Sequence, residues 1–182
     1  MGSGQWADII ATGGMLPQQD GLVEVIDKAK RDGKFIIVGG PDPTSQPEIY
    51  KNADALVLNE GEITISMWLE SWKNGNPRRT FITAEKPDVS LTPIPRFDLV
   101  NFSDYFYMGV QYARGCPFNC EFCDIIELYG RKPRHKSPEQ LIAELQMIYD
   151  LGFRGYIEIV DDNFIGNKRN VKCELLPALI KW

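Results

Sequence analysis

The stretch Gly115-Cys116-Pro117-Phe118-Asn119-Cys120-Glu121-Phe122-Cys123 places three of the chain's four cysteines within eight residues. The cysteines are four and then three residues apart, so one loop can wrap a polynuclear iron–sulfur centre with a thiolate at each of three corners. One iron of a four-iron cluster is then left without a protein ligand. Because electron-transfer clusters normally have four protein ligands, the open iron indicates a cluster that binds and reduces a substrate.

The same stretch resembles the cluster motif of the radical S-adenosylmethionine (SAM) enzymes, Cys-x-x-x-Cys-x-aromatic-Cys, with Phe122 as the aromatic residue. The resemblance implies a 4Fe-4S cluster held by Cys116, Cys120 and Cys123, whose open iron chelates SAM. It implies that an electron from the cluster cleaves SAM to a 5′-deoxyadenosyl radical, and that Phe122 lies beside the adenine. An electron donor such as flavodoxin or ferredoxin is the implied partner.

Two other interpretations of the cysteines stay open. Structural zinc prefers four ligands, often as two Cys-x-x-Cys pairs, whereas here one pair gains a third cysteine and Cys173 stands fifty residues further on. Alternatively, Cys173 completes an electron-transfer cluster that never cleaves SAM. A buried helix position is the ordinary interpretation of Cys173. Either alternative describes a non-catalytic interaction or electron-transfer module.

Composition limits the class of protein and its partners. The chain has 182 residues, of which 43% are hydrophobic, which fits a soluble globular protein of one domain or two small ones. A net charge of −5 without a long basic run argues against a nucleic-acid partner. No apolar run approaches the roughly 18 to 20 residues that span a bilayer, and the N-terminus lacks a secretory pattern. We therefore expect a cytoplasmic protein without a transmembrane segment.

The second half of the chain reads as two strand–helix units. A strand over residues 108–113 leads into the cysteines, and Ser137-Pro138-Glu139-Gln140 is a strong helix start. The helix carries an apolar stripe, and a further strand over residues 156–160 runs into Asp161-Asp162-Asn163. Strands of a TIM-like barrel meet at one carboxyl edge, which would bring these side chains towards the open iron. Turn or capping roles are the alternative for the two aspartates. The predicted stripe comprises Leu141, Leu145, Ile148 and Tyr149.

The run from Gly115 to Lys168 is similar to the B12-binding-domain radical SAM proteins, some of which methylate hopanoid lipids or other metabolites. By this resemblance, Asp161, Asp162 and Asn163 occupy the place of a Gly-Gly-Glu motif that accepts hydrogen bonds from the SAM ammonium. The resemblance implies a cobalamin-dependent methyltransferase acting on a small molecule or a lipid. Because a full barrel of this family has about six strand–helix units, we expect the chain to be incomplete at both ends and inactive alone.

The first half alternates strand and helix signals, which predicts a parallel sheet with its loops at one edge. Expected strands cover residues 7–11, 34–38 and 55–58, with helices from Leu22 to a cap at Gly33, over 47–52 and over 63–73. The loops are similar to those in the second half of a cobalamin-binding Rossmann domain. The resemblance implies cobalamin contacts from Thr12, Gly39, Gly40, Glu60, Gly61 and Glu62.

The sequence departs from that family in one respect, because its only histidine, His135, lies in the other half and no Asp-x-His-x-x-Gly motif supplies a cobalt ligand. The expected organisation is a partial Rossmann-like domain over 1–75, a Pro-rich linker over 76–105 and the N-terminal part of a radical SAM barrel over 106–182. The basic residues of segment 131–136 are expected to form a solvated turn. A last helix is expected to kink at Pro177.

Overall fold

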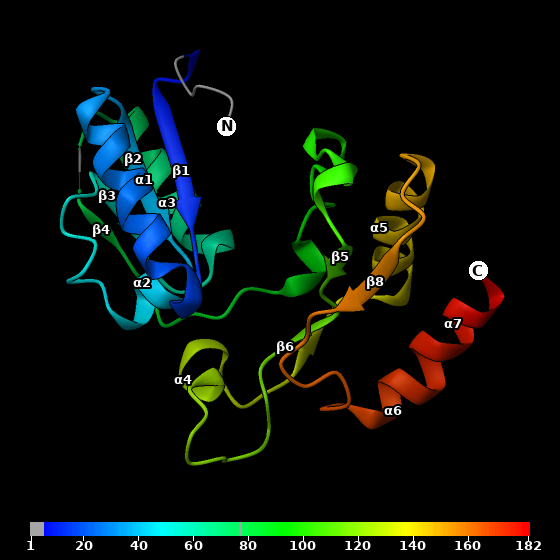
Figure 1. The fold of residues 1–182 in the computed structure, drawn as a ribbon. Coiled ribbons are helices and arrows are strands. Elements are labelled where there is room, and N and C mark those ends of the chain that lie inside the picture. The colour runs from blue at the N-terminus through cyan, green and yellow to red at the C-terminus, as the bar shows by residue number, and fades with distance from the viewer. Residues whose placement is uncertain (1–5, 77) are drawn as a thin grey trace. The chain divides into compact units, whose positions relative to one another are not determined.

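The computed structural model describes residues 6–76 and 78–182, so residues 1–5 and Pro77 of the expected linker lie outside the described part. The chain divides into two compact units, Met1–Pro87 and Asp88–Trp182 (Figure 1). The division falls within the stretch expected to be a linker. Each unit has a parallel strand pairing of its own.

Unit 1 is built on a four-stranded parallel sheet in the order β1-β2-β3-β4. The parallel arrangement predicted from the strand–helix alternation is confirmed. Its last strand lies within the stretch expected to be a linker, where two residues pair with Leu56 and Val57. So short a strand carries no hydrophobic periodicity, which is why the sequence did not reveal it. The strands are β1 (Ile9–Gly13), β2 (Phe35–Gly39), β3 (Ala55–Val57) and β4 (Thr80–Phe81).

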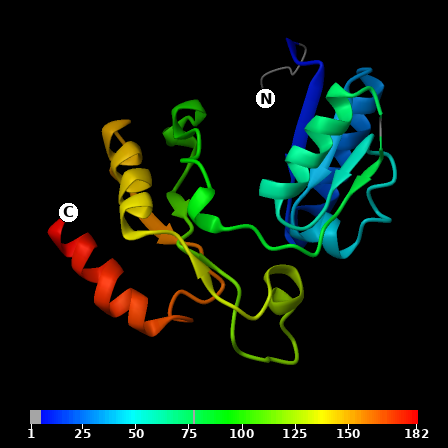
Figure 2. The same ribbon diagram turned by 180° about the vertical axis from the view of Figure 1, so that it is seen from behind.

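Two long helices cover opposite faces of this sheet, α1 (Gln19–Arg31) in front in Figure 1 and α3 (Gly61–Lys73) in front in Figure 2. Alternate residues of β2 therefore enter different cores: Ile36 packs with α1 residues, and Ile37 packs towards Met67 and Trp68. Burial on both faces explains the continuous apolar run of this strand. Gly33 follows α1 at φ +68°, as expected of a residue that ends a helix.

The short helix expected over residues 47–52 is wrong. A five-residue helix, α2 (Pro41–Ser45), forms earlier, directly after β2, and residues 47–52 form turns. Pro41 stands at the first helical position, where its fixed φ suits the helix and its missing N–H costs nothing. The turns that replace the expected helix bring Tyr50 into the core. A 3₁₀ turn, η2 (Leu16–Gln18), precedes α1.

Unit 2 contains two short strand pairs rather than one continuous sheet. β5 (Tyr107–Val110) pairs in parallel with β8 (Tyr156–Ile159), as expected of successive barrel strands. β6 (Ala113–Arg114) pairs antiparallel with β7 (Arg134–His135). The strand expected over 108–113 is thus divided after Val110, and its second part leads into the cysteines. Three 3₁₀ turns precede β5, namely η3 (Val89–Leu91), η4 (Phe97–Leu99) and η5 (Phe102–Asp104).

The helix α5 (Pro138–Asp150) begins as its sequence predicts. Ser137 accepts from the backbone N–H of Gln140, and the Gln140 side chain accepts from the backbone of Ser137, which completes a capping box. Leu141 and Ile148 are buried in the core of unit 2. Tyr149 was expected in the buried stripe but is 51% exposed, and the buried polar residue of this face is Glu144.

The last helix has three segments instead of one kinked helix. A π-helical turn (η6, Val171–Leu175) lies between α6 (Lys168–Asn170) and α7 (Leu176–Lys181), with Pro177 in the first turn of α7. Proline has no N–H to bond the carbonyl four residues back, and the wider turn before it accommodates this loss. Within residues 6–76 and 78–182, no helix has both the length and the apolar character needed to cross a bilayer.

Candidate cluster and cofactor site

The segment 115–133, here called the cysteine loop, leaves and re-enters unit 2 at one narrow point, called the neck. The neck consists of the β6–β7 pair and a hydrogen bond from the Cys116 N–H to the Gly130 carbonyl, 3.1 Å long. Gly115 has φ +90°, and a Cβ there would lie 2.9 Å from the carbonyl oxygens of Gly130 and Lys132. Only glycine satisfies both constraints, so the closure of the neck explains the glycine that precedes Cys116.

The three cysteines of the loop are free thiols at different depths. Cys116 and Cys123 are half-buried, and Cys120 is exposed. The N–H of Cys123 bonds the carbonyl of Cys120 at 3.2 Å, and helix α4 (Ile125–Tyr129) begins directly afterwards. Within the described residues, no three His, Cys, Asp or Glu side chains converge as the ligands of a single metal ion would. A cubane holds its thiolates at separate corners and does not require such convergence.

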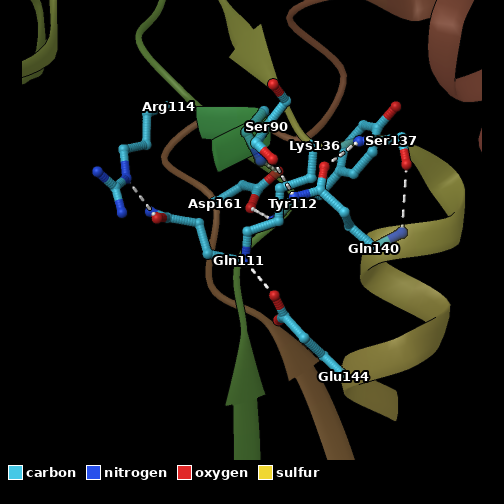
Figure 3. Close-up of polar contacts among 10 residues, drawn as sticks. Ser90, Gln111, Tyr112, Arg114, Lys136, Ser137, Gln140, Glu144 and Asp161 are labelled. Carbon is cyan, nitrogen blue, oxygen red and sulfur yellow. Dashed lines mark hydrogen bonds and ion pairs between the residues drawn. The ribbon is translucent and has the colours of Figure 1, made fainter. Parts of the chain in front are cut away.

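Asp161 connects the end of β8 to the entrance of the cysteine loop. Its two carboxylate oxygens accept hydrogen bonds from the backbone N–H groups of Tyr112 and Ala113, at 2.7 and 2.9 Å (Figure 3). Burial raises the pKa of Asp161, although the two N–H donors act in the opposite direction. The sequence resemblance predicted that this carboxylate contacts the ammonium group of SAM. In the structure it fixes the backbone two and three residues before Gly115, a role that sequence reasoning missed.

The next two residues point to different surroundings. Asp162 is exposed, and partial desolvation together with the nearby Asp124 raises its pKa. The Asn163 side-chain amide donates to the Cys116 sulfur, with Nδ2 and Sγ 3.3 Å apart. The end of β8 therefore does lie close to the cysteines, as predicted, through this one contact between Asn163 and Cys116. Phe122 is 93% exposed, and its predicted contact with adenine stays a prediction.

A buried ion pair lies below the neck, where the sequence predicted only a solvated basic turn. Lys136 donates to Glu144 of α5 at 2.5 Å, and both side chains are almost fully buried (Figure 3). The backbone N–H of Lys136 also bonds the carbonyl of Tyr112 at 2.9 Å. The expectation was thus wrong for Lys136, and also for Arg134 and His135, which are half-buried and form strand β7 instead of a turn. Glu144 lies three residues after Leu141 and four before Ile148, and a polar residue within an apolar stripe was the signal for a buried partner.

The strand ends of unit 1 gather the residues predicted to contact cobalamin, but their glycines are explained by the protein's own backbone. A Cβ on Gly39 would lie 2.7 Å from the Val57 carbonyl oxygen, and one on Gly40 would lie 3.0 Å from the Gly14 carbonyl oxygen. Gly40 also has φ +101°. Glu60 is buried and lies 4.0 Å from the Lys86 ammonium. These contacts need no ligand, so they do not test cobalamin binding. Thr12, Gly61 and Glu62 lie at the same strand ends.

Asp42, which sequence reasoning did not single out, is the polar centre of this edge. It is buried, and its carboxylate accepts from Gln19 on both oxygens, at 3.2 and 3.1 Å, from Gln46 at 3.0 Å and from the hydroxyl of Tyr50. Its backbone N–H bonds the Gly14 carbonyl at 3.2 Å. Asp42 therefore holds the loops after β1 and β2 together with the Tyr50 turn.

The donor set of unit 2 fits an iron–sulfur cluster. Cys116, Cys120 and Cys123 are the soft ligands that such clusters require, and they share one loop at the carboxyl end of a strand. The amide at Cys116 is of the kind that hydrogen-bonds cluster sulfurs in proteins. In unit 1, no comparable donor set for a cobalt ion is present among the described residues.

These features together define an α/β chain with the fold of the radical SAM methyltransferases. The structure of one such enzyme, TsrM from Kitasatospora setae with a tryptophan substrate and a SAM analogue bound, superposes with a TM-score of 0.74 over 96% of this chain and 40% of that chain, at 14% sequence identity. The match confirms the fold class expected from the sequence. No protein-family model matches the chain.

Sequence comparison identifies relatives among methyltransferases. The chain is 52% identical to an uncharacterised methyltransferase of Synechocystis sp. over 97% of its own length and 33% of that protein. It is 39% identical to the hopanoid C-2 methylase of Rhodopseudomonas palustris over 97% of its length and 34% of that protein. The resemblance recognised in the sequence is thereby confirmed. The chain spans about a third of the length of the curated relatives that it matches.

Proposed function

We propose that this chain is the part of a radical SAM methyltransferase that binds the iron–sulfur cluster and SAM. The observation that carries the proposal is the cysteine loop, whose three free thiols follow β6. The loop is closed by the β6–β7 pair and by Gly115, where a Cβ would meet backbone carbonyls. The names of the relatives and the fold of TsrM support methyl transfer as the reaction of the whole protein. A small molecule or a lipid is the substrate class, as for the hopanoid methylase.

Each residue of the site has a role in this proposal. Cys116, Cys120 and Cys123 hold the cluster, and the cluster, when bound, supplies the electron that cleaves the sulfonium of SAM. Asp161 holds the entrance of the cysteine loop through two backbone amides. Asp162 is the exposed carboxylate at this strand end and is the candidate acceptor for the SAM ammonium. The exposed ring of Phe122 is available to pack against the adenine.

Cobalamin is the finer part of the proposal. Its support is the likeness of the unit 1 loops to those of a cobalamin-binding domain, and the chain offers no histidine in unit 1 as a cobalt ligand. Gly39 and Gly40 are required because neighbouring backbone lies too close for a side chain. The proposal of cobalamin binding therefore rests on the order of strands and loops in unit 1. Corrinoid content after purification from cells supplied with cobalamin tests this part separately from the cluster.

Anaerobic reconstitution of the full chain with iron and sulfide tests the cluster. The expected product is brown and oxygen-sensitive, with iron and sulfide in the proportions of a four-iron cluster. After reduction, SAM should change the electron paramagnetic resonance spectrum, because SAM binds at the open iron. Protein that holds no iron would contradict the proposal. Tightly bound zinc without a visible chromophore would support the zinc alternative instead.

A further inference from the structure

The contact between Asn163 and Cys116 joins two segments that are far apart in the sequence. Asn163 follows β8, and Cys116 opens the cysteine loop 47 residues earlier, yet Nδ2 and Sγ are 3.3 Å apart. Both side chains are half-buried. The backbone carbonyl of Asn163 accepts from the N–H of Gly166 at 3.0 Å, so the residue is part of a closed turn. The amide is therefore held next to the sulfur by structure on both sides.

The chemistry of the two groups fixes the direction of the interaction. A cysteine thiolate that binds a metal accepts hydrogen bonds and has no proton to donate. The amide nitrogen of asparagine is a donor, and its oxygen is not. The contact is therefore an N–H···S hydrogen bond to the sulfur of a proposed cluster ligand.

Asp161 ensures that this hydrogen bond has a fixed geometry. Its carboxylate binds the N–H groups of Tyr112 and Ala113, which lie four and three residues before Cys116. Two residues after Asp161, the amide of Asn163 reaches the sulfur itself. The end of β8 thus holds the beginning of the cysteine loop at the backbone and at a ligand atom.

We propose that Asn163 is a positioning residue that raises the reduction potential of the cluster through its hydrogen bond to the sulfur of Cys116. The inference rests on the proposed function, since it requires that Cys116 bind the cluster. Reduction adds negative charge to the cluster and its thiolates, so a hydrogen-bond donor stabilises the reduced state more than the oxidised state. Removing the donor should therefore make the cluster harder to reduce.

The test compares reduction potentials of the reconstituted full chain and two variants. Asn163→Leu removes the donor at similar size, and Asn163→Asp keeps the shape but replaces the donor with a negative charge. We expect full iron content and a reduction equilibrium shifted about tenfold in Asn163→Leu, which is about 59 mV towards negative potential for a one-electron couple. Asn163→Asp should shift further in the same direction. Asn101→Leu, which removes an exposed amide of unit 2 that contacts no cysteine sulfur, should leave the potential unchanged.

Each other outcome overturns the inference in a recognisable way. Equal potentials in the wild-type chain and Asn163→Leu, at equal iron content, would show that the amide does not tune the cluster. A wild-type potential in Asn163→Asp would show that shape alone matters. Loss of iron from both variants would assign the amide to the folding of the loop instead. The proposed function is judged separately, because it fails only if the wild-type chain itself takes up no cluster.

Discussion

The polar and reactive groups at the carboxyl ends of the parallel strands differ between the two units. In unit 1, the polar centre of this edge is Asp42, whose carboxylate is saturated by neutral donors from the same unit. In unit 2, the corresponding edge opens into a long loop with three free thiols and the exposed ring of Phe122. The first edge is stable by its own contacts, whereas the second presents groups that its own fold does not use.

This difference shows which polar residues indicate a ligand and which are explained by the stability of the fold. A buried carboxylate with every acceptor position occupied is explained by stability alone. Three thiols in one loop, with a backbone neck built to close it and an amide donor at one sulfur, are not needed for the core of unit 2. Substitutions at the two edges should therefore differ in what they remove: cluster binding in unit 2 and stability in unit 1.

Replacing any one of the three loop cysteines by serine should abolish the cluster. A cluster of this kind depends on each of its few thiolates, and a serine hydroxyl is a harder and much less acidic ligand. Iron content and visible absorbance after anaerobic reconstitution measure the effect. Cys173→Ser is the matched control and should keep the cluster, because Cys173, which was wrongly expected to be buried, is exposed in the π-helical turn. Iron loss in that control would support the electron-transfer alternative.

Lys136→Met should destabilise unit 2 by about 3–5 kcal/mol, because it leaves the carboxylate of Glu144 buried without its partner. Urea unfolding followed by the fluorescence of Trp182, in a background where the tryptophans of unit 1 are phenylalanine, measures this unit. The exposed Lys132→Met is the matched control, expected within about 0.5 kcal/mol of the parent. Adding Glu144→Leu to Lys136→Met should restore most of the loss, since an apolar pair replaces the unpaired charge.

Asp42→Asn should destabilise unit 1 by about 1–3 kcal/mol, because the amide replaces one acceptor oxygen by an NH2 donor that faces the donors Gln19 and Gln46. Unfolding followed through Trp68 and Trp72 measures the change. Asp8→Asn, at an exposed position, is the control and should have little effect.

Tyr50, whose hydroxyl donates to Asp42, should make the stability of unit 1 depend on pH. Burial, and secondly the hydrogen bond and charge of Asp42, raise the pKa of Tyr50 above its usual value. The folded state therefore holds the proton of the Tyr50 hydroxyl more tightly than the unfolded state, in which tyrosine ionises at about pH 10. Stability that is present below that pH should fall as the pH rises above it. Tyr50→Phe should remove this part of the alkaline loss; an unchanged pH profile would contradict the assignment.

The smallest expected effect is that of Ser137→Ala, which removes the capping box of α5. The cost should be about 0.5–2 kcal/mol, typical of an N-cap serine, and should appear in unit 2 only. Thermal unfolding followed by Trp182 fluorescence measures it. Ser66→Ala, an exposed serine within α3, is the control. A loss in the control as large as in Ser137→Ala would show that the cap contributes nothing specific.

The sequence predicted those parts of the fold that depend on local rules. The capping box at Ser137, the end of α1 at Gly33 and the apolar run of β2 each require only neighbours in the sequence, and each prediction is confirmed. The two-residue strand β4 and the antiparallel β6–β7 pair were missed because strands this short carry no periodicity.

The candidate site was predictable in its ligands but not in its supporting contacts. The spacing of the cysteines is a local pattern, whereas the contacts of Asp161 with Tyr112 and Ala113 join residues 49 and 48 positions apart. The pairing of Lys136 with Glu144 likewise depends on how α5 packs below the neck. Only the polar residue within the stripe of α5 marked it beforehand. Long-range polar contacts of this kind leave little trace in a single sequence.

The neck has a consequence for how this chain tolerates change. The neck is closed by the β6–β7 pair, by the bond from the Cys116 N–H to the Gly130 carbonyl and by Gly115, and the Tyr129 carbonyl also accepts from the Arg134 side chain. The segment 117–123, which precedes α4, supplies none of these contacts. Insertions or exchanges of that segment should leave the scaffold beneath intact, provided that Gly115 and Gly130 remain. The neck thus separates the segment that carries Cys120 and Cys123 from the scaffold, so that this segment can be exchanged without rebuilding unit 2.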